Sequence, residues 1–544
     1  MASQIHEKTL LAIGALRQNK LTESLQLSDE ILAQDPNNAS AYATQFSALF
    51  KAKQFEQARQ IGGQAAKLNP NSLFILNNQA CLQLDANQPA AAATLLRSLI
   101  NQFGERGQWL YNLGLALRLA GKLEDAIKGF ERALDIQANH DRAAFQLAEC
   151  LIVSGRLEEA LIALNRVRLL RPTHAVSHAQ YIHHAVANQK LDQVGLKLEL
   201  RYWQERFIPK QKQYPIRTVQ ADGPITLAFN IGNIPEHWLT QTIAPTINTF
   251  SERFYKVIVY WQEENFKDEL FDSKVTIVKS AELSDAQFAQ RVRNDRVDAL
   301  IDVCGLRRGT RQRALGLQLA SIQCGWMAHE GDYAADTVNL IEDHIQRLPF
   351  CLGEKNIGTT TVGTEWPTNT LAARGTHQGI SDQVLNSWGT ILNSLEDWKL
   401  HLDCQSLSIQ NNIKRMFSKM GINSERLLFN DALSLNSKTI VLDNFINNDP
   451  IAIGKALGQG GIVVALKGEF FPAQRSAKVL SHFDRGHWLV NTPFDYQERV
   501  ISLANNELNE ADFRPISDSE WLESDIDNID DFCDSVRAAL LSQQ

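Results

Sequence analysis

The sequence lacks several features that would assign it directly to a class. No apolar run approaches the roughly 20 residues that span a bilayer, and the first residues lack the basic and then apolar pattern of a secretory signal. The seven cysteines are scattered, without a Cys-x-x-Cys pair or a histidine cluster at metal-ligand spacing. We therefore expect a cytoplasmic chain with reduced thiols, no bound metal ion and no membrane partner.

An excess of positive charge is also absent. Lys and Arg number 54 against 62 Asp and Glu, which gives a net charge of -8. General nucleic-acid binding requires Lys/Arg-rich surfaces that displace counterions, so we expect no nucleic-acid partner. The hydrophobic fraction of 44% and the charged fraction of 21% are those of ordinary globular proteins, and 544 residues are too many for one hydrophobic core. Several domains are therefore expected.

A period of 34 residues runs through the first third of the chain. Its clearest unit, residues 109–134, has the pattern of two short amphipathic helices joined at Gly121-Lys122. This is the tetratricopeptide pattern, and it predicts a helical solenoid of about five repeats over residues 1–172. The positions that share the period are Pro36, Pro70 and Pro172 and the small residues Ser24, Ala58, Ala92, Ala126 and Ala160.

Side-chain amides recur at one position of consecutive repeats, at Asn78, Asn112 and Gln146. A solenoid leaves a long concave groove, and one amide per repeat can clamp the backbone of an extended peptide because each amide offers a donor and an acceptor. The same residues can also be ordinary solvated polar side chains. We take the groove as the candidate acceptor-binding surface.

The pattern changes after the repeats. Residues 173–217 keep a helical periodicity and are expected to form a helical connector. Short apolar runs ending in Gly, Asn or Asp then alternate with amphipathic stretches, which predicts two α/β lobes, over 218–357 and 373–544, with a Gly/Thr-rich linker at 358–372 and a C-terminal helix in the second lobe. The expected strands are 225–230, 255–260, 275–278, 297–303, 398–403, 426–429, 439–443 and 461–466, with a helix over 284–294.

Several of these segments resemble one enzyme family. The segment 295–305, followed by Arg311 and by 319–326, resembles a stretch of the O-GlcNAc transferase and SPINDLY-type enzymes. Segments 388–392, 420–429 and 456–469, with Arg475, resemble the second lobe of that family in the same order. The similarity spans about 225 to 505 and agrees with the repeats that this family carries ahead of its lobes. It implies a GT-B fold of two Rossmann-like lobes, with a nucleotide sugar in the cleft between them.

Departures from this family fall on its donor-binding residues. Ile234 takes the place of the family's histidine beside the acceptor, and the nearest imidazole is His237. The His-Thr-Thr turn that holds the donor pyrophosphate becomes Asn447-Asn-Asp-Pro, so that Asp449 brings negative charge there. A phosphate-neutralising lysine aligns near Gly379, and the acidic ribose partner aligns with Lys455. Binding of UDP-GlcNAc in the family's way is therefore not expected.

Two main explanations remain open. The lobes can be a catalytically inactive scaffold of an adaptor or chaperone, or an active transferase whose donor is not a UDP-sugar; an O-GlcNAc-type transferase with a UDP- or GDP-sugar is a further alternative. The loop 327–333 contains an acid-Gly pair similar to a motif of CMP-sialic-acid transferases, in which the acid takes the proton of the acceptor hydroxyl. Glu330 is then the base, with His329 as its neighbour and His237 as the second candidate. The alternative for these residues is a plain polar turn.

Tetratricopeptide repeats ahead of such lobes resemble the bacterial enzymes that glycosylate flagellin with nonulosonic acids. The resemblance implies an inverting protein O-glycosyltransferase that captures flagellin in the repeat groove and transfers the sugar from a CMP donor to Ser/Thr hydroxyls, without any other cofactor. Arg and Lys suit the phosphate and the carboxylate of such a donor. The candidate residues are Glu330, His237 and His329 for catalysis, and Arg311, Asn448, Asp449, Lys455, Gly460 and Arg475 for donor binding.

Overall fold

The computed structural model describes most of the chain, which divides into two compact units, Met1–Leu151 and Ile152–Gln544. No helix among the described residues is long and apolar enough to cross a membrane. The described residues are 2–68, 73–208, 225–232, 234, 236–254, 256–263, 268–307, 309–326, 369–373, 380–429, 439–445, 448–468, 471–505, 515–516 and 518–542.

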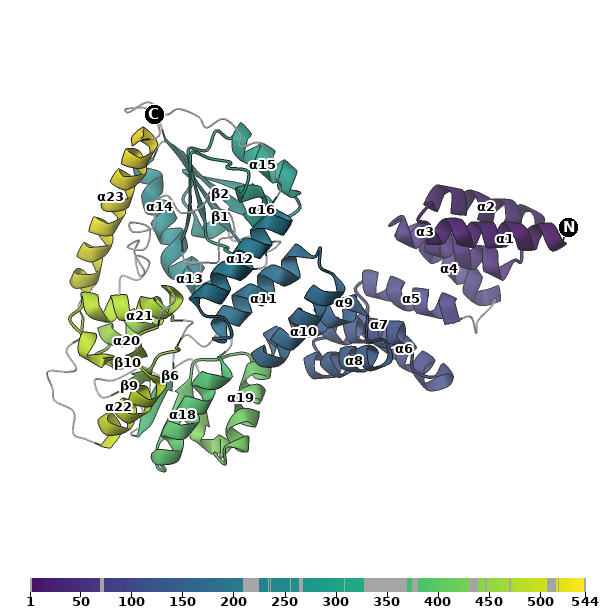
Figure 1. Cartoon of the computed structure of the whole chain (residues 1–544). Helices are drawn as coiled ribbons and strands as arrows, with labels where there is room; N and C mark the ends of the chain where they lie inside the picture. Colours follow the sequence, from purple (N-terminus) through teal and green to yellow (C-terminus); the bar gives the residue numbers. More distant parts are fainter. Residues whose placement is uncertain are drawn as a thin grey trace. The chain divides into compact units, whose positions relative to one another are not determined.

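The first unit is a row of helix hairpins (Figure 1). Small residues allow the two helices of a hairpin to approach closely: a Cβ atom at Gly114 would lie 2.6 Å from the ring of Phe130, which is fully buried. The helices are α1 (Ala2–Arg17), α2 (Leu21–Gln34), α3 (Ala39–Lys51), α4 (Phe55–Leu68), α5 (Leu73–Asp85), α6 (Pro89–Phe103), α7 (Gly107–Leu119), α8 (Leu123–Ile136) and α9 (Asp141–Val153).

The second unit begins with three more helices, α10 (Leu157–Leu170), α11 (Ala175–Ala187) and α12 (Gln193–Phe207). Within the described residues the repeat pattern therefore extends to twelve helices, and the expected connector continues it as a further hairpin. The indole Nε1 of Trp203 in α12 donates a hydrogen bond to the Ala175 carbonyl at 3.0 Å, and Trp203 and Phe207 pack in one apolar cluster with Leu306 of the first lobe. This cluster attaches the last hairpin to the lobe.

The first lobe contains a parallel five-stranded sheet of order β3-β2-β1-β4-β5. Alternate residues of each strand face opposite layers: Phe229 of β1 packs with α14 and α23, whereas Ala228 packs with α15 and α16. The elements are β1 (Thr226–Ile231), α13 (Glu236–Trp238), α14 (Ala244–Arg253), β2 (Lys256–Trp261), β3 (Val275–Lys279), α15 (Asp285–Asn294), β4 (Ala299–Asp302), α16 (Gln312–Leu315), β5 (Ile322–Gly325) and α23 (Asp518–Ser542).

The second lobe contains a six-stranded sheet of order β11-β10-β9-β6-β7-β8, also parallel. Helices α18, α19 and α22 cover one face, and α20 and α21 cover the other. The elements are β6 (Thr370–Ala373), α18 (Asp382–Ser394), β7 (Lys399–Leu402), α19 (Leu407–Lys419), β8 (Leu427–Leu428), β9 (Ile440–Leu442), α20 (Pro450–Gly458), β10 (Ile462–Leu466), α21 (Phe471–His482), β11 (Leu489–Val490) and α22 (Pro493–Asn505).

The predicted class, a tetratricopeptide solenoid followed by two Rossmann-like lobes, is confirmed. Two boundaries differ from those expected. The last three residues of the expected linker, 370–372, form β6 together with Ala373, and this strand lies between β7 and β9 in the second sheet. Helix α23, expected in the second lobe, buries Ile529, Phe532 and Val536 in the core of the first lobe, and Figure 1 shows it beside α14. The chain therefore returns to the first lobe after completing the second.

Candidate donor-binding site

The carboxyl edge of the first sheet is built around a buried carboxylate. Asp302 ends β4, the strand beside β1, where the strand order reverses and doubly wound sheets bind ligands. Its Oδ1 accepts hydrogen bonds from the Asn230 side chain at 2.6 Å and the Cys304 N–H at 3.3 Å, and its Oδ2 accepts from Gly305 N–H and the Gln312 side chain. Burial nevertheless raises the pKa of Asp302 to about 6.

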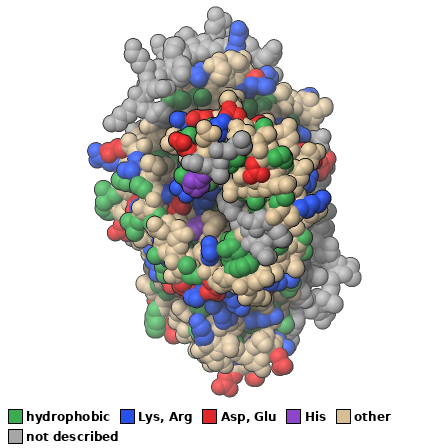
Figure 2. Space-filling model, turned by 90° about the vertical axis from the view of Figure 1, so that its right-hand side faces the viewer, with side chains coloured by type: hydrophobic (Ala, Val, Ile, Leu, Met, Phe, Trp, Pro, Cys, Tyr) green, Lys and Arg blue, Asp and Glu red, His purple; other side chains and the backbone are tan. Residues whose placement is uncertain are grey.

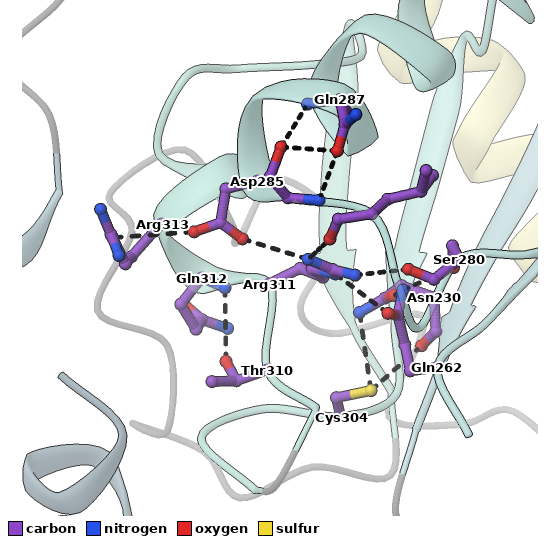
Figure 3. Close-up of polar contacts among 12 residues, drawn as sticks. Asn230, Gln262, Ser280, Asp285, Gln287, Cys304, Thr310, Arg311, Gln312 and Arg313 are labelled. Atoms are coloured by element: carbon purple, nitrogen blue, oxygen red, sulfur yellow. Dashed lines mark hydrogen bonds and ion pairs between the residues drawn. The ribbon is translucent and has the colours of Figure 1, made fainter. Parts of the chain in front are cut away.

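A chain of polar contacts fixes the loops at this edge (Figure 3). Gln262 donates to Asn230 Oδ1 at 2.7 Å and accepts from Arg311 Nε at 3.0 Å. The Arg311 guanidinium also donates to the Ser280 carbonyl at 2.6 Å and to the Leu283 carbonyl at 2.8 Å, besides its ion pair with Asp285. These four N–H donations to the protein position this edge, and the predicted binding of the donor by Arg311 stays a prediction.

The second sheet repeats this arrangement. Asp443 follows β9, which lies beside β6 just as β4 lies beside β1. The Asn448 side chain donates to Asp443 Oδ2 at 2.9 Å and to the Asn444 carbonyl, and its Oδ1 accepts from Ser476 N–H at 3.4 Å. Burial raises the pKa of Asp443 to about 7. The Asn448 amide is fully buried and engaged in these contacts, so its predicted role in binding the donor stays a prediction that requires the amide to exchange or share them.

The N-terminus of α20 is occupied by the chain's own carboxylate. Asp449 Oδ1 accepts hydrogen bonds from Ile451 N–H at 3.1 Å and Ala452 N–H at 3.2 Å. These are the N–H groups that a phosphate would use at a helix N-terminus. Asp449 therefore caps the helix, and its negative charge opposes a diphosphate at this position. Its predicted contact with the donor stays a prediction.

Two arginines, one from each lobe, approach the ring of Trp238 in α13. The guanidinium carbon of Arg307, in the loop after β4, lies 5.4 Å from the ring centroid, and that of Arg475, in α21, lies 5.2 Å from it. Arg307 is 6% exposed and Arg475 is 2% exposed. Two buried positive charges beside one aromatic ring favour an anion with an adjacent flat or apolar group. This Trp238 cluster (Trp238, Arg307 and Arg475) is the strongest candidate for a donor contact.

Backbone geometry helps place Arg307. Gly309, two residues further on, has a φ of +88° and would bring a Cβ atom to 3.4 Å from the Gln262 Cβ. A side chain would therefore be disfavoured both by the conformation and by the close approach to β2's end. The absence of a side chain at position 309 therefore allows this segment to approach the end of β2 closely.

The other predicted residues lie in different places. His237 belongs to α13, next to Trp238 in the chain, and Glu330 and His329 lie outside the described residues. Lys455 is in the last turn of α20 and is partly exposed. Gly460 has a φ of +77° and forms the turn before β10, at the amino edge of the sheet. Its predicted role in binding the donor stays a prediction. Of the predicted donor ligands, Arg475 alone joins the Trp238 cluster.

The amides of the solenoid are largely engaged with one another. Asn112 is 3% exposed and donates to Asn77 Oδ1 at 2.9 Å, while Asn78 donates to Ser47 Oγ at 2.8 Å. Gln146 is partly exposed, and its Oε1 is buried without a hydrogen bond. Binding of a peptide by Asn78, Asn112 and Gln146 stays a prediction, and it requires the first two amides to exchange or share these contacts.

Sequence reasoning did not single out Trp238, Arg307, Asp302 or Asp443. The two aspartates had a signal, since each ends an apolar run of an expected strand, where parallel sheets place ligand-binding groups. Among the described residues no group of three or more His, Cys, Asp and Glu side chains could hold a metal ion. On the face drawn in Figure 2, Lys and Arg side chains stand among Asp and Glu side chains.

Comparisons with known proteins agree with this architecture. Two family models, both described as tetratricopeptide repeat, match residues 77–141 and 117–180. A mutant of the Thermobaculum terrenum O-GlcNAc transferase superposes with a TM-score of 0.67 at 17% identity, over 86% of this chain and 98% of that chain. The repeats and sheets thus define the class, a tetratricopeptide-repeat protein with the GT-B fold seen in that structure.

The curated relatives are probable peptide glycosyltransferases. The chain is 20% identical over 345 residues to a probable UDP-N-acetylglucosamine-peptide N-acetylglucosaminyltransferase SPINDLY of Eustoma exaltatum subsp. russellianum, and 21% identical over 350 residues to that of Arabidopsis thaliana. Each match covers 56% of this chain and 38% of the relative, so the chain spans well under half of their length. The predicted resemblance to O-GlcNAc transferase and SPINDLY is confirmed, whereas that to flagellin-modifying enzymes stays a prediction.

Proposed function

We propose that the chain is a protein O-glycosyltransferase, in which the solenoid captures a protein acceptor and the two lobes transfer a sugar from a nucleotide donor to Ser/Thr hydroxyls. The sequence similarity to SPINDLY and the GT-B fold support the reaction class. The tetratricopeptide repeats support capture of a protein, since solenoids of this type present extended concave surfaces.

The proposed donor is an acidic sugar on a single phosphate, of the CMP-nonulosonate type. Two observations support this choice: Asp449 caps the α20 N-terminus, and Arg307 and Arg475 are buried together at Trp238. A diphosphate at α20 would meet a carboxylate. A donor with one phosphate and one carboxylate offers two anions to two guanidinium groups, each of which can bind an anion in bidentate fashion.

The proposed reaction is a single inverting displacement. The carboxylate of Glu330 takes the proton of the acceptor hydroxyl, the hydroxyl oxygen forms a bond to the anomeric carbon, and the bond from that carbon to the CMP phosphate breaks. CMP leaves with the bonding electron pair, and the arginines stabilise the charge that develops on its phosphate. His237 is the second candidate for the base; its position in α13, next to Trp238 in the chain, supports this choice. His329, the sequence neighbour of Glu330, is the third catalytic candidate.

The acceptor that we propose is flagellin, and the test is its intact mass. The full chain is incubated with flagellin and CMP-nonulosonate, UDP-GlcNAc or a GDP-sugar. We expect a discrete mass increase with CMP-nonulosonate alone. Arg475→Lys keeps a positive charge but loses the planar fork, so it should raise the KM for the donor, whereas Lys419→Gln, which removes an exposed charge from α19, should change nothing. Glu330→Gln should abolish transfer and leave acceptor binding intact. No mass increase with any donor would reject the proposal.

A non-catalytic adaptor or chaperone is the second candidate. The Asp449 cap favours it, because its carboxylate occupies the helix N-terminus with negative charge where the fold binds nucleotide phosphates. Calorimetry separates the two functions: a transferase binds CMP or another nucleotide, and an adaptor binds the protein partner with no nucleotide affinity. Binding of UDP with transfer from UDP-GlcNAc would instead support an O-GlcNAc-type enzyme.

A further inference from the structure

A cavity of about 560 Å³ opens at the beginning of the solenoid, between α1, α3 and α5. Ile13, Leu16 and Phe50 provide large apolar side chains, and α3 contributes Ala43 and Ser47 from the same helix face. Because these α3 side chains are small, space remains above the helix. Asn78 of α5 closes one side and is held by its hydrogen bond to Ser47 Oγ at 2.8 Å.

The cations at this cavity are Arg17 and Lys51. They lie 34 residues apart, at the same position of the first two repeats, and both side chains are exposed. Lys51 Nζ donates to the Leu16 carbonyl at 3.1 Å, which places its ammonium group beside the residue that precedes Arg17. No Asp or Glu is among the described residues that line the cavity. The cavity therefore combines an apolar interior with positive charge at its edge.

We propose that this cavity binds an extended acidic segment of a partner protein, in which a large apolar side chain fills the hollow and flanking Asp or Glu side chains pair with Arg17 and Lys51. The choice of internal acidic residues over a chain terminus follows from the geometry. Neighbouring helices pack about 8–10 Å apart, and an extended chain rises about 3.3 Å per residue. Two carboxylates about three residues apart therefore match cations on successive repeats, whereas a terminus offers one carboxylate.

An acidic residue in the third repeat limits the length of the acidic segment that can bind. The equivalent position there is Asp85, which is exposed and acidic. An acidic peptide that continued past Asn78 would meet like charge, so the recognised segment is short and its acidic part lies over the first two repeats. The inference rests on the proposed capture of a protein by the solenoid, but not on the transfer chemistry.

The probe is a fluorescent, N-acetylated and C-amidated octapeptide with the core Glu-Leu-Phe-Asp, titrated with the full chain by anisotropy. Each of Arg17→Ala and Lys51→Ala should weaken binding about threefold and the double variant about tenfold, with smaller effects at high salt. Lys67→Ala is the matched control, because it removes an exposed charge from the neighbouring helix α4. Ala43→Leu fills the hollow and leaves both cations, so it should abolish binding while the helical circular dichroism is retained.

Peptide variants test each part of the recognition. Replacing Leu-Phe by Ala-Ala in the core should weaken binding at least about tenfold. The Arg17→Glu/Lys51→Glu chain should bind a Lys-Leu-Phe-Lys core and reject the acidic one. Equal binding of the acidic and basic peptides to the native chain, an unchanged double variant, or equal binding of a peptide whose single carboxylate is a free C-terminus would overturn the inference. A chain that binds the acidic peptide selectively but transfers no sugar would reject the transferase and leave this inference standing.

Discussion

Replacing Asp449, the N-terminal cap of α20, distinguishes its contribution to helix stability from its effect on phosphate binding. The Asp449 carboxylate accepts hydrogen bonds from Ile451 and Ala452 N–H at 3.1 and 3.2 Å. Serine at position 449 keeps a capping oxygen and removes the charge. We therefore expect the free energy of unfolding of Asp449→Ser to lie within about 0.5 kcal/mol of that of the native chain, whereas Asp449→Ala should lower it by about 1 kcal/mol.

The magnitude for nucleotide binding follows from the same contacts. A phosphate oxygen on these N–H groups would displace the carboxylate, at a cost of about 1 kcal/mol for the lost cap. Two unit charges about 5 Å apart at an effective dielectric of about 20 repel by about 3 kcal/mol. Asp449 thus weakens a diphosphate at α20 by up to about a thousandfold, and serine should restore about a hundredfold.

The assay is calorimetry of UDP and CMP with both chains at about 0.1 M salt. UDP should gain affinity in Asp449→Ser, and CMP should change less than about threefold because its phosphate lies at the Trp238 cluster. No gain for UDP would show that Asp449 is not the obstacle. An equal gain for CMP would show that its phosphate also lies at α20, and either result refutes the reasoning.

Three further variants test the folded structure. Burial raises the pKa of Asp443 from its usual 3.8 to about 7, so its stabilising contribution is complete below pH 3.8 and is lost as pH rises through 7. Thermal unfolding at pH 4 and pH 8 should show Asp443→Asn gaining on the order of 4 kcal/mol over the native chain at the higher pH, and a constant difference would contradict this. Gly114→Ala should cost about 1–3 kcal/mol in urea unfolding because its Cβ meets Phe130, whereas Gly63→Ala, with open space around it, should be neutral or stabilising; equal effects would speak against the close helix contact. Asn412→Ala removes the 3.0 Å hydrogen bond to the Gly155 carbonyl and should lower the local stability of α10 and α19, measured by amide hydrogen exchange, by about 1–2 kcal/mol. Asn411→Ala, at an exposed position, should leave the exchange unchanged, and similar exchange in both variants would reject this contact.

The repeats and most strands were predictable because their patterns are local. The 34-residue period identifies the hairpins, and strands such as Lys256–Trp261 are apolar runs with β-branched residues. Strand β6 was missed because Thr370–Ala373 is short and rich in alanine, and it sits in a stretch that otherwise has the composition of a linker. The attachment of α23 to the first lobe was beyond reach, since contacts such as Phe250 with Phe532 join residues far apart in the sequence.

The candidate site was predictable only in part. Sequence patterns indicated negative charge at Asp449 and a contact role for Arg475. They could not show that Asp449 accepts hydrogen bonds from the helix N–H groups. Nor could they show that the Arg311 guanidinium donates hydrogen bonds to Gln262, Ser280 and Leu283. The Trp238 cluster requires a contact between the two lobes, because Arg475 comes from the second lobe and Trp238 and Arg307 come from the first. A local sequence pattern does not predict such a contact.

A crystal structure of the full chain with CMP-nonulosonate, or with CMP alone, tests the account most directly. We expect the phosphate to lie between the Arg307 and Arg475 guanidinium groups, beside Trp238, with Asp449 still capping α20. A phosphate bound to the Ile451 and Ala452 N–H groups with Asp449 displaced would contradict the account, and so would a Trp238 cluster without nucleotide at millimolar CMP.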